Sequence, residues 1–218
     1  MTPRTKETLT GPLDQLAALR RNPLFSHKIA LDSCVGSILS VVGPEAFFAR
    51  LDVKIMGNPQ IDGDIPLQWI FPILESKMDK NVSVGIFFRQ LANMADKMYT
   101  EASKLDKLQS AVYFALYREI WALFPQFCQN LVDPASDFLR PAYAKGLNSI
   151  LESTSEQHRD IKQHVISGLR KLAIFSLSEG KEEYKKVMAK FAPNYLKTLL
   201  HMYRAKELAA NVMSAAKV

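Results

Sequence analysis

Apolar residues in the segment 106–128 recur at helical spacing on two sides of the helix that they predict. An aromatic side carries Phe114, Tyr117, Trp121 and Phe124. The other side is aliphatic and consists of Leu108, Val112, Ala115, Leu116, Ile120 and Leu123. A helix that is apolar on two sides lies between neighbours. The pattern predicts layered helices, and the central helix of one compact bundle remains the alternative.

The same spacing predicts helices along most of the chain, and no persuasive strand alternation occurs. The clearest amphipathic helix covers residues 84–102. Proline and glycine mark the breaks: Gly43-Pro44 ends one helix and opens the next, Pro72 is expected to bend a helix, and Pro193 to interrupt the last one. The remaining predicted helices cover residues 13–19, 26–42, 44–51, 66–78, 133–152, 155–177 and 181–204.

Paired helices begin near Pro66, Asp106 and Ser155, so successive pairs start 40 and 49 residues apart. This is the period of HEAT and armadillo arrays. The predicted fold is therefore an all-α, HEAT/armadillo-like α-solenoid of stacked helix pairs. Its expected boundaries are an N-terminal arm at 1–25, partly flexible, a helical repeat domain at 26–204, and a frayed C-terminal tail at 205–218.

Composition favours one soluble domain in a reducing compartment. The chain has 218 residues, of which 48% are hydrophobic and 23% charged, enough to bury a large core. Cys34 and Cys128 provide no disulfide framework and no metal cluster. The first eleven residues lack the apolar core of a signal peptide, and no membrane partner is expected.

Catalytic motifs are absent from the sequence. It contains no phosphate-binding glycine loop followed by Lys-Ser or Lys-Thr, no HExxH and no nucleophile elbow. The four histidines are scattered, and loop solvation is the simplest role for Asp62 and Asp64. We therefore expect no enzyme, no catalytic residue, no metal, no cofactor and no small-molecule substrate.

Charge is concentrated near the C-terminus. Residues 155–206 carry eleven Lys and Arg against five Asp and Glu, whereas residues 1–154 carry sixteen of each. In a continuous helix, four basic residues from Lys186 to Arg204 would lie within about 40° of one another. The predicted RNA-binding or acidic-partner face consists of Arg170, Lys171, Lys185, Lys186, Lys190, Lys197 and Arg204. An ordinary solvated helix surface remains the alternative, with Arg89, Lys97, Arg140 and Lys145 as other candidate contacts.

Several ordered blocks resemble one known family. Residues 69–74 read WIFPIL, residues 120–128 read IWALFPQFC and are followed by Val132-Asp133-Pro134, and residues 187–196 read VMAKFAPNYL. Across about residues 26–204 these blocks resemble the central region of the ribosomal-RNA-processing protein 12 family, large nucleolar HEAT-repeat proteins. Family members are several times longer than this chain, and the stretch 140–155 fits their pattern loosely.

The resemblance implies a scaffold that binds pre-ribosomal RNA and ribosome assembly factors, and that assists small-subunit maturation and nuclear export. It also implies a nucleolar or nuclear protein that shuttles to the cytoplasm, with contacts to the nuclear transport machinery. No catalytic residue is implied, because Trp121, Phe124, Pro125 and Phe127 have the character of core packing. An importin-like transport adaptor and a protein-only solenoid scaffold remain the alternatives.

Overall fold

The computed structural model describes residues 11–50, 69–78 and 82–215, and the side chains of these residues except 50 and 206–215. Helices dominate this part of the chain, and the described residues form no β-sheet beyond one isolated bridge between Val82 and Leu131. The elements are α2 (Leu13–Arg21), α3 (Lys28–Arg50), α5 (Ile70–Lys77), α6 (Val84–Ile86), the π-helical η1 (Phe87–Ala92), α7 (Asn93–Ala102), α8 (Lys107–Ala122), the 3-10 helix η2 (Phe124–Cys128), α9 (Pro141–Glu152), α10 (Glu156–Leu177) and α11 (Glu182–Ala215).

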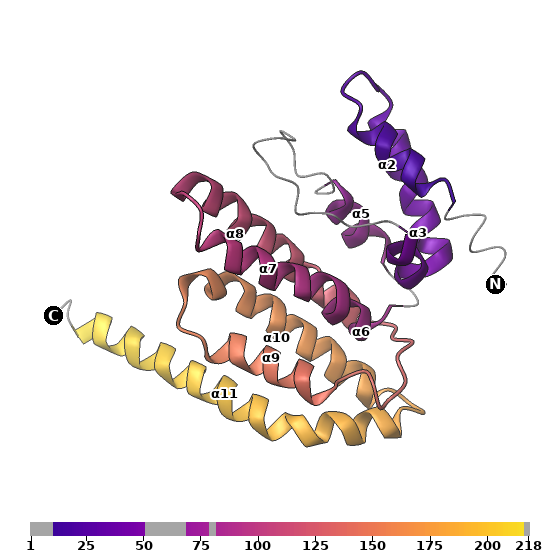
Figure 1. The fold of residues 1–218 in the computed structure, drawn as a ribbon. Helices are drawn as coiled ribbons and strands as arrows, with labels where there is room; N and C mark the ends of the chain where they lie inside the picture. The colour runs from indigo at the N-terminus through magenta and orange to yellow at the C-terminus, as the bar shows by residue number, and fades with distance from the viewer. Residues whose placement is uncertain (1–10, 51–68, 79–81, 216–218) are drawn as a thin grey trace.

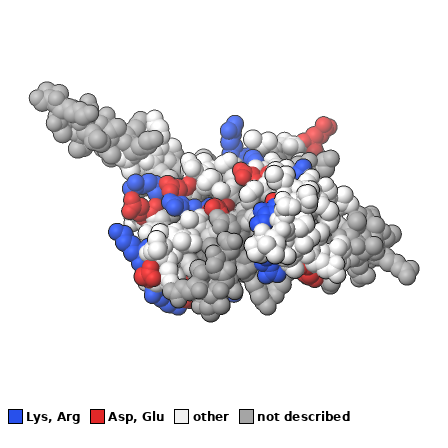
Figure 2. All heavy atoms as spheres, turned by 90° about the horizontal axis from the view of Figure 1, so that it is seen from above, with Lys and Arg blue, Asp and Glu red and all other residues white. Residues whose placement is uncertain are grey.

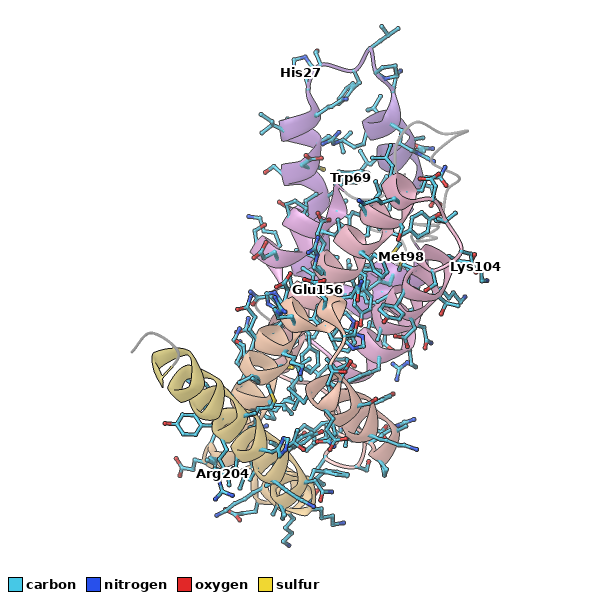
Figure 3. All side chains as sticks on the ribbon, turned by 90° about the vertical axis from the view of Figure 1, so that its left-hand side faces the viewer. His27, Trp69, Met98, Lys104, Glu156 and Arg204 are labelled. Atoms are coloured by element: carbon cyan, nitrogen blue, oxygen red, sulfur yellow. The ribbon has the colours of Figure 1, made fainter. Side chains whose placement is uncertain are left out.

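The helices stack in layers in the order of the chain (Figure 1). The helices α2, α3 and α5 pack together at one end, α7 and α8 follow, then α9 and α10, and α11 closes the other end. Figure 3 shows the same progression from the side, with Trp69 in the first layers and Arg204 on α11. Each layer contacts its neighbours along the chain, which confirms the predicted α-solenoid.

The helix pair predicted to start at Asp106 differs in the structure. Helix α8 packs most extensively against α7, which precedes it, whereas the predicted register paired the helix starting at Asp106 with the one that follows it. A short turn explains the difference, because four residues separate α7 from α8. Helix α10 packs against η2, α8, α9 and α11, so the predicted pairing of the helix starting near Ser155 with the last helix is present.

Helix α3 contains the break predicted at Gly43-Pro44. Gly43 has a φ of 80°, which splits the element into a longer helix and a short one that Pro44 opens. By length and composition alone, residues Lys28–Ala49 could cross a membrane. The unbroken part before Gly43 is only about 22 Å long, short of the roughly 30 Å of a bilayer core. Packing against α2 and α5 makes α3 a core helix here.

A buried carboxylate fixes the start of the next continuous helical rod, 84–102. Asp133 accepts a hydrogen bond from the Ser83 hydroxyl at 2.6 Å and another from the Val84 N–H at 2.7 Å. The Ser83 oxygen in turn accepts from the N–H of Ile86. A helix N-terminus leaves its first N–H groups without intrahelical partners, and these bonds satisfy two of them. The loop after η2 is thereby tied to the start of α6.

This use of Asp133 corrects the predicted start of a helix there. Residues 134–139 form turns, and α9 begins at Pro141, whose missing N–H is tolerated at a first helical position. Two other proline predictions were wrong. Pro72 lies in the first turn of α5, where no intrahelical N–H bond is lost. Pro193 lies inside the continuous α11, on its exposed side, where water can reach the freed carbonyl.

The aromatic side predicted for 106–128 forms the centre of the core. The Phe87 ring lies 5.3 Å from Trp121, 5.0 Å from Phe124 and 5.4 Å from Phe127, measured between ring centroids. All four side chains are buried. The aliphatic side is buried only in its second half, because Leu108 is 79% exposed and Val112 is 39% exposed. Helix α8 is therefore enclosed on two sides only beyond its first turns.

Helix α10 approaches the aromatic centre at a glycine. A Cβ atom on Gly168 would lie 2.3 Å from Phe124 Cε1 and 3.2 Å from Cys128 Sγ. Both partners are fully buried, so neither can move aside without disturbing the core. The absence of a side chain at position 168 thus sets the spacing between α10 and η2.

Some predictions lie outside the described residues. These are the first ten residues of the arm predicted at 1–25, the loop at 56–64 with Asp62 and Asp64, and the helix start at Pro66. The backbone of α11 stays helical to Ala215, past the predicted end at Arg204, and fraying of the tail stays a prediction.

The first testable prediction concerns Trp121. Its side chain is 2% exposed and packs on Phe87, so Trp121→Ala should lower the free energy of unfolding by about 3–5 kcal/mol. Urea denaturation monitored by circular dichroism measures the loss. Leu108→Ala is the control on the same helix, and its exposed side chain should leave the midpoint nearly unchanged. Equal midpoints for both variants would contradict the role of Trp121.

A second prediction follows from the close approach at Gly168. Gly168→Ala should destabilise the chain by about 1–3 kcal/mol, because overpacking outweighs the higher helix propensity of alanine. Gly146→Ala on α9 is the matched control, since a Cβ there would meet no atom within 4 Å. That variant should gain up to about 1 kcal/mol. Shifts of the same sign in both denaturation curves would show that the contact does not restrict α10.

Candidate nucleic-acid interface

Helix α11 lies along α9 and α10 and presents one side to them. The side chains on that side are buried or half-buried, and Tyr195 donates a hydrogen bond to the Ala144 carbonyl at 3.2 Å. These packed residues are Tyr184, Val187, Met188, Phe191, Tyr195, Thr198, Leu199 and Met202. The opposite side of α11 is consequently exposed to solvent.

Four of the seven predicted site residues share that exposed side. Lys186, Lys190, Lys197 and Arg204 are all exposed, and at 100° per residue they lie within about 40° around the axis. The helix continues through Pro193, which is the condition that this alignment requires. We refer to these four residues as the basic stripe.

The other three predicted residues do not join the basic stripe. Lys171 is half-buried and donates to the Gln129 side chain at 3.2 Å, on the side of α10 that faces η2. Arg170 is exposed but projects from α10. Lys185 is on α11 about 100° from Lys186, with its Nζ 3.9 Å from a Glu182 oxygen. The positions of these residues around their helices therefore divide the predicted face.

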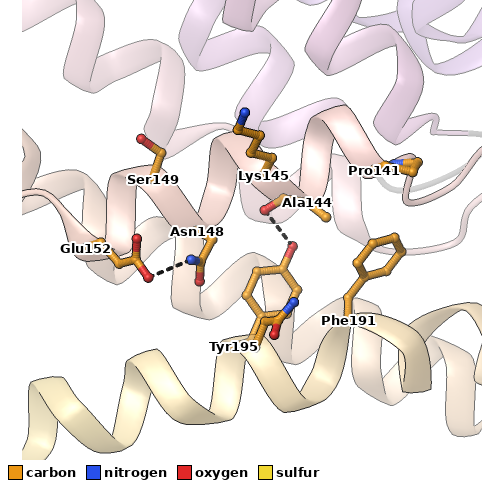
Figure 4. Close-up of a pocket in the computed structure, with 9 residues that line it drawn as sticks. Pro141, Ala144, Lys145, Asn148, Ser149, Glu152, Phe191 and Tyr195 are labelled. Carbon is orange, nitrogen blue, oxygen red and sulfur yellow. Dashed lines mark hydrogen bonds between the residues drawn. The ribbon is translucent and has the colours of Figure 1, made fainter.

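Two adjoining hollows lie between α9 and α11. The smaller, about 440 Å³, is shown in Figure 4, where Lys145 and Phe191 are among the lining residues and Asn148 donates to Glu152 at 2.8 Å. The larger, about 910 Å³, extends to the turn between α9 and α10. Both include Asn148, Glu152 and Asn194, so they form one groove along α11.

Basic side chains from two helices line the larger hollow. Lys197 reaches it from the basic stripe, and Arg159, Lys162 and His201 join it. Ser153, Thr154 and Ser155 add hydroxyl groups at the turn. Analysis of the sequence omitted Arg159 and Lys162 from the site. Their spacing of three residues in the first turns of the helix that follows Ser155 is the signal that could have identified them.

The positive field of Lys162 extends to a neighbouring ring. Burial, and then Lys162, lower the pKa of His158, whose Nδ1 lies 2.6 Å from the Ser153 hydroxyl. His158 is therefore uncharged near neutral pH. Charge elsewhere is mixed, because basic and acidic side chains lie next to each other on the face seen in Figure 2.

The other candidate basic contacts are dispersed. Arg140 forms an ion pair with Asp137 at 2.9 Å, and Lys145 lines the smaller hollow. Arg89 and Lys97 are exposed on η1 and α7. In the described part of the chain, no group of three or more His, Cys, Asp and Glu side chains could hold a metal ion. Burial raises the pKa of the Cys128 thiol well above its usual value, so that thiol is unreactive.

The helical layers agree with comparisons to known proteins. The sequence profile described as "Ribosomal RNA-processing protein 12, HEAT repeats" matches residues 1–206. The chain belongs to this family. That membership accounts for the layered α-solenoid, and it confirms the resemblance to this family.

Individual relatives show moderate identity. The human RRP12-like protein is 27% identical over 197 residues, which are 88% of this chain and 14% of the relative. The chicken RRP12-like protein is 27% identical over 199 residues, 89% of this chain and 15% of the relative. The fission yeast putative ribosomal RNA-processing protein 12 is 25% identical over 157 residues, 70% of this chain and 13% of the relative. The chain thus spans about one seventh of the length of these relatives.

Proposed function

We propose that this chain is a non-enzymatic HEAT-repeat scaffold in ribosome biogenesis, which binds pre-ribosomal RNA and assembly factors. The observation that carries the proposal is the basic stripe, which lies on the exposed side of an otherwise packed helix in a chain of the ribosomal RNA-processing protein 12 family. The proposed function includes assistance in small-subunit maturation and nuclear export, with a nucleolar or nuclear location and shuttling to the cytoplasm.

Phosphate is the partner that best fits the stripe. Lys186, Lys190 and Lys197 have no acidic partner in the described residues, so their charges are available to an external anion. Neutralisation of phosphates by such side chains releases condensed counterions and supplies affinity without sequence preference. A scaffold that tracks an RNA backbone needs no catalytic group, cofactor or metal.

The groove beside the stripe suits the same partner. Lys197 belongs to both surfaces, so a backbone bound along α11 could continue past Arg159 and Lys162. Glu152, the carboxylate in the groove, already accepts hydrogen bonds from Asn148 at 2.8 Å and Thr198 at 3.3 Å. Hydroxyl groups at the turn from α9 to α10 are suitable donors to phosphate or ribose oxygens.

A protein-only scaffold or an importin-like adaptor is the second candidate function. Exposed apolar side chains on α11 favour it, because Leu196, Leu200 and Tyr203 are 58%, 56% and 61% exposed. Leu200 lies between Lys197 and Arg204 on the same side of the helix. Apolar groups at this position suit contact with another helix better than contact with phosphate.

The third prediction separates the two functions. Substitution of Lys186, Lys190 and Lys197 by Gln should reduce the slope of log K against log salt for RNA binding by roughly two to three units. The slope is measured by filter binding or fluorescence anisotropy with pre-ribosomal RNA at several salt concentrations. Stability should hardly change, because exposed lysines contribute little to it.

Lys28→Gln, Lys77→Gln and Lys107→Gln provide the matched control. These substitutions remove the same charge from other helices, so this triple variant should keep most of the wild-type slope. If the stripe variant binds with unaltered affinity and slope, the stripe is a solvated helix face. Phosphate contacts would then be sought at Arg89, Lys97, Arg140 and Lys145.

A further inference from the structure

A pocket of about 520 Å³ lies between α7 and α9, apart from the groove on α11. Its charge and its walls differ from those of the groove, and no Lys or Arg side chain lines it. The rings that line it are Phe88, Tyr99, Tyr117, Trp121, Tyr143 and His158.

The rings are held in two fixed groups. Tyr99 stacks on His158 with centroids 5.2 Å apart and an interplanar angle of 23°, and it lies 5.2 Å from Tyr117. Phe88 stacks on Tyr143 at 4.2 Å with an angle of 5°. Contacts between rings fix their orientations, so a ligand would meet a preorganised aromatic surface.

Small residues keep the α9 wall of the pocket open. Ala142, Gly146 and Ser149 form this wall, and a Cβ atom added to Gly146 would meet nothing within 4 Å. Tyr99, Tyr143 and His158 are half-buried rather than fully buried. Part of the aromatic surface is consequently accessible from outside.

Asp96, an exposed residue that lines the pocket, supplies its negative charge. Its carboxylate makes no hydrogen bond and no ion pair with the described part of the chain. Desolvation raises the pKa of Asp96, and the Asp96 charge also helps burial to raise the pKa of Tyr117. Since His158 is uncharged near neutral pH, no positive charge in the pocket offsets the carboxylate.

We propose that this pocket binds an arginine side chain from a basic protein segment. A guanidinium stacks on Tyr rings and donates paired hydrogen bonds to a carboxylate, which is the combination of groups that Asp96 and the half-buried Tyr99 and Tyr143 present. An RNA phosphate is disfavoured, because it would meet Asp96 without a basic side chain to neutralise it. The pocket thus adds a second partner to the proposed function, a positively charged protein segment beside the negatively charged RNA.

The experiment uses the fluorescence of Trp121, which lines the pocket. Trp69, the other tryptophan, is replaced by Phe in all proteins compared. The probe is acetyl-Gly-Arg-Gly-amide, and the matched neutral probe carries citrulline in place of arginine. We expect a saturable change in Trp121 emission with the arginine peptide and binding at least about fivefold weaker with the citrulline peptide.

Asp96→Asn should weaken binding of the arginine peptide by a similar factor of about three to ten. Glu183→Gln, at an exposed carboxylate on α11, is the matched control and should keep the wild-type affinity. Thermal melts by circular dichroism establish that each variant is folded. The comparison of the two peptides on the protein with an intact Asp96 does not depend on any pocket variant.

Four results would overturn the proposal. The first is equal binding of the arginine and citrulline peptides, and the second is unchanged affinity in Asp96→Asn. The third is a saturable response to guanosine or uridine monophosphate with none to the arginine peptide, which would assign the pocket to an RNA base. No response of folded protein to the arginine peptide at tens of millimolar would also contradict it.

Discussion

The contact between Gly168 and Phe124 determines how the layers of this chain stack. Without a Cβ atom at position 168, α10 comes close enough for the glycine backbone to cover the Phe124 ring and the Cys128 sulfur. Phe124 in turn packs on Phe87 and Trp121, so one close approach joins α10 to both helices of the preceding pair. An interior packed at crystal-like density transmits such a restriction, because its rings have no free volume in which to move.

Hydrogen bonds to Asp133 restrict the stacking of the layers in addition to this apolar contact. The buried carboxylate of Asp133 binds Ser83 and the backbone of Val84, and thereby connects the loop after η2 with the start of the α6–α7 rod. Tyr184 of α11 donates to the Asp133 carbonyl at 2.7 Å. A single residue therefore links three successive layers. The position of α11, and with it the direction of the basic stripe, depends on this loop as well as on the packed side of α11.

Local periodicity was sufficient to predict the helices but not their surroundings. The helices around Trp121 and Leu169, and the break at Gly43, follow from spacing and backbone chemistry, which are properties of neighbouring residues. Asp133 was misjudged because its acceptors are satisfied fifty residues away, and Pro193 because an exposed carbonyl can bind water in place of the lost N–H. The predicted basic face is divided for a similar reason. The alignment of the stripe follows from the periodicity of one helix, whereas tertiary packing turns Lys171 towards Gln129.

Basic and acidic surfaces lie on different layers of the chain, which a count of charged residues along the sequence does not show. The excess of basic residues from 155 to 206 lies on helices whose exposed sides face solvent, while the α7–α9 pocket contains an unpaired carboxylate and no basic side chain. A solenoid turns each helix side in a different direction, so neighbouring layers can carry surfaces of opposite sign, which here come close enough for the Lys162 charge to act on His158 in the wall of the pocket. An assembly that contains both RNA and basic proteins offers a partner for each of these surfaces, and the rigid stacking set at Gly168 keeps the two surfaces at a fixed separation.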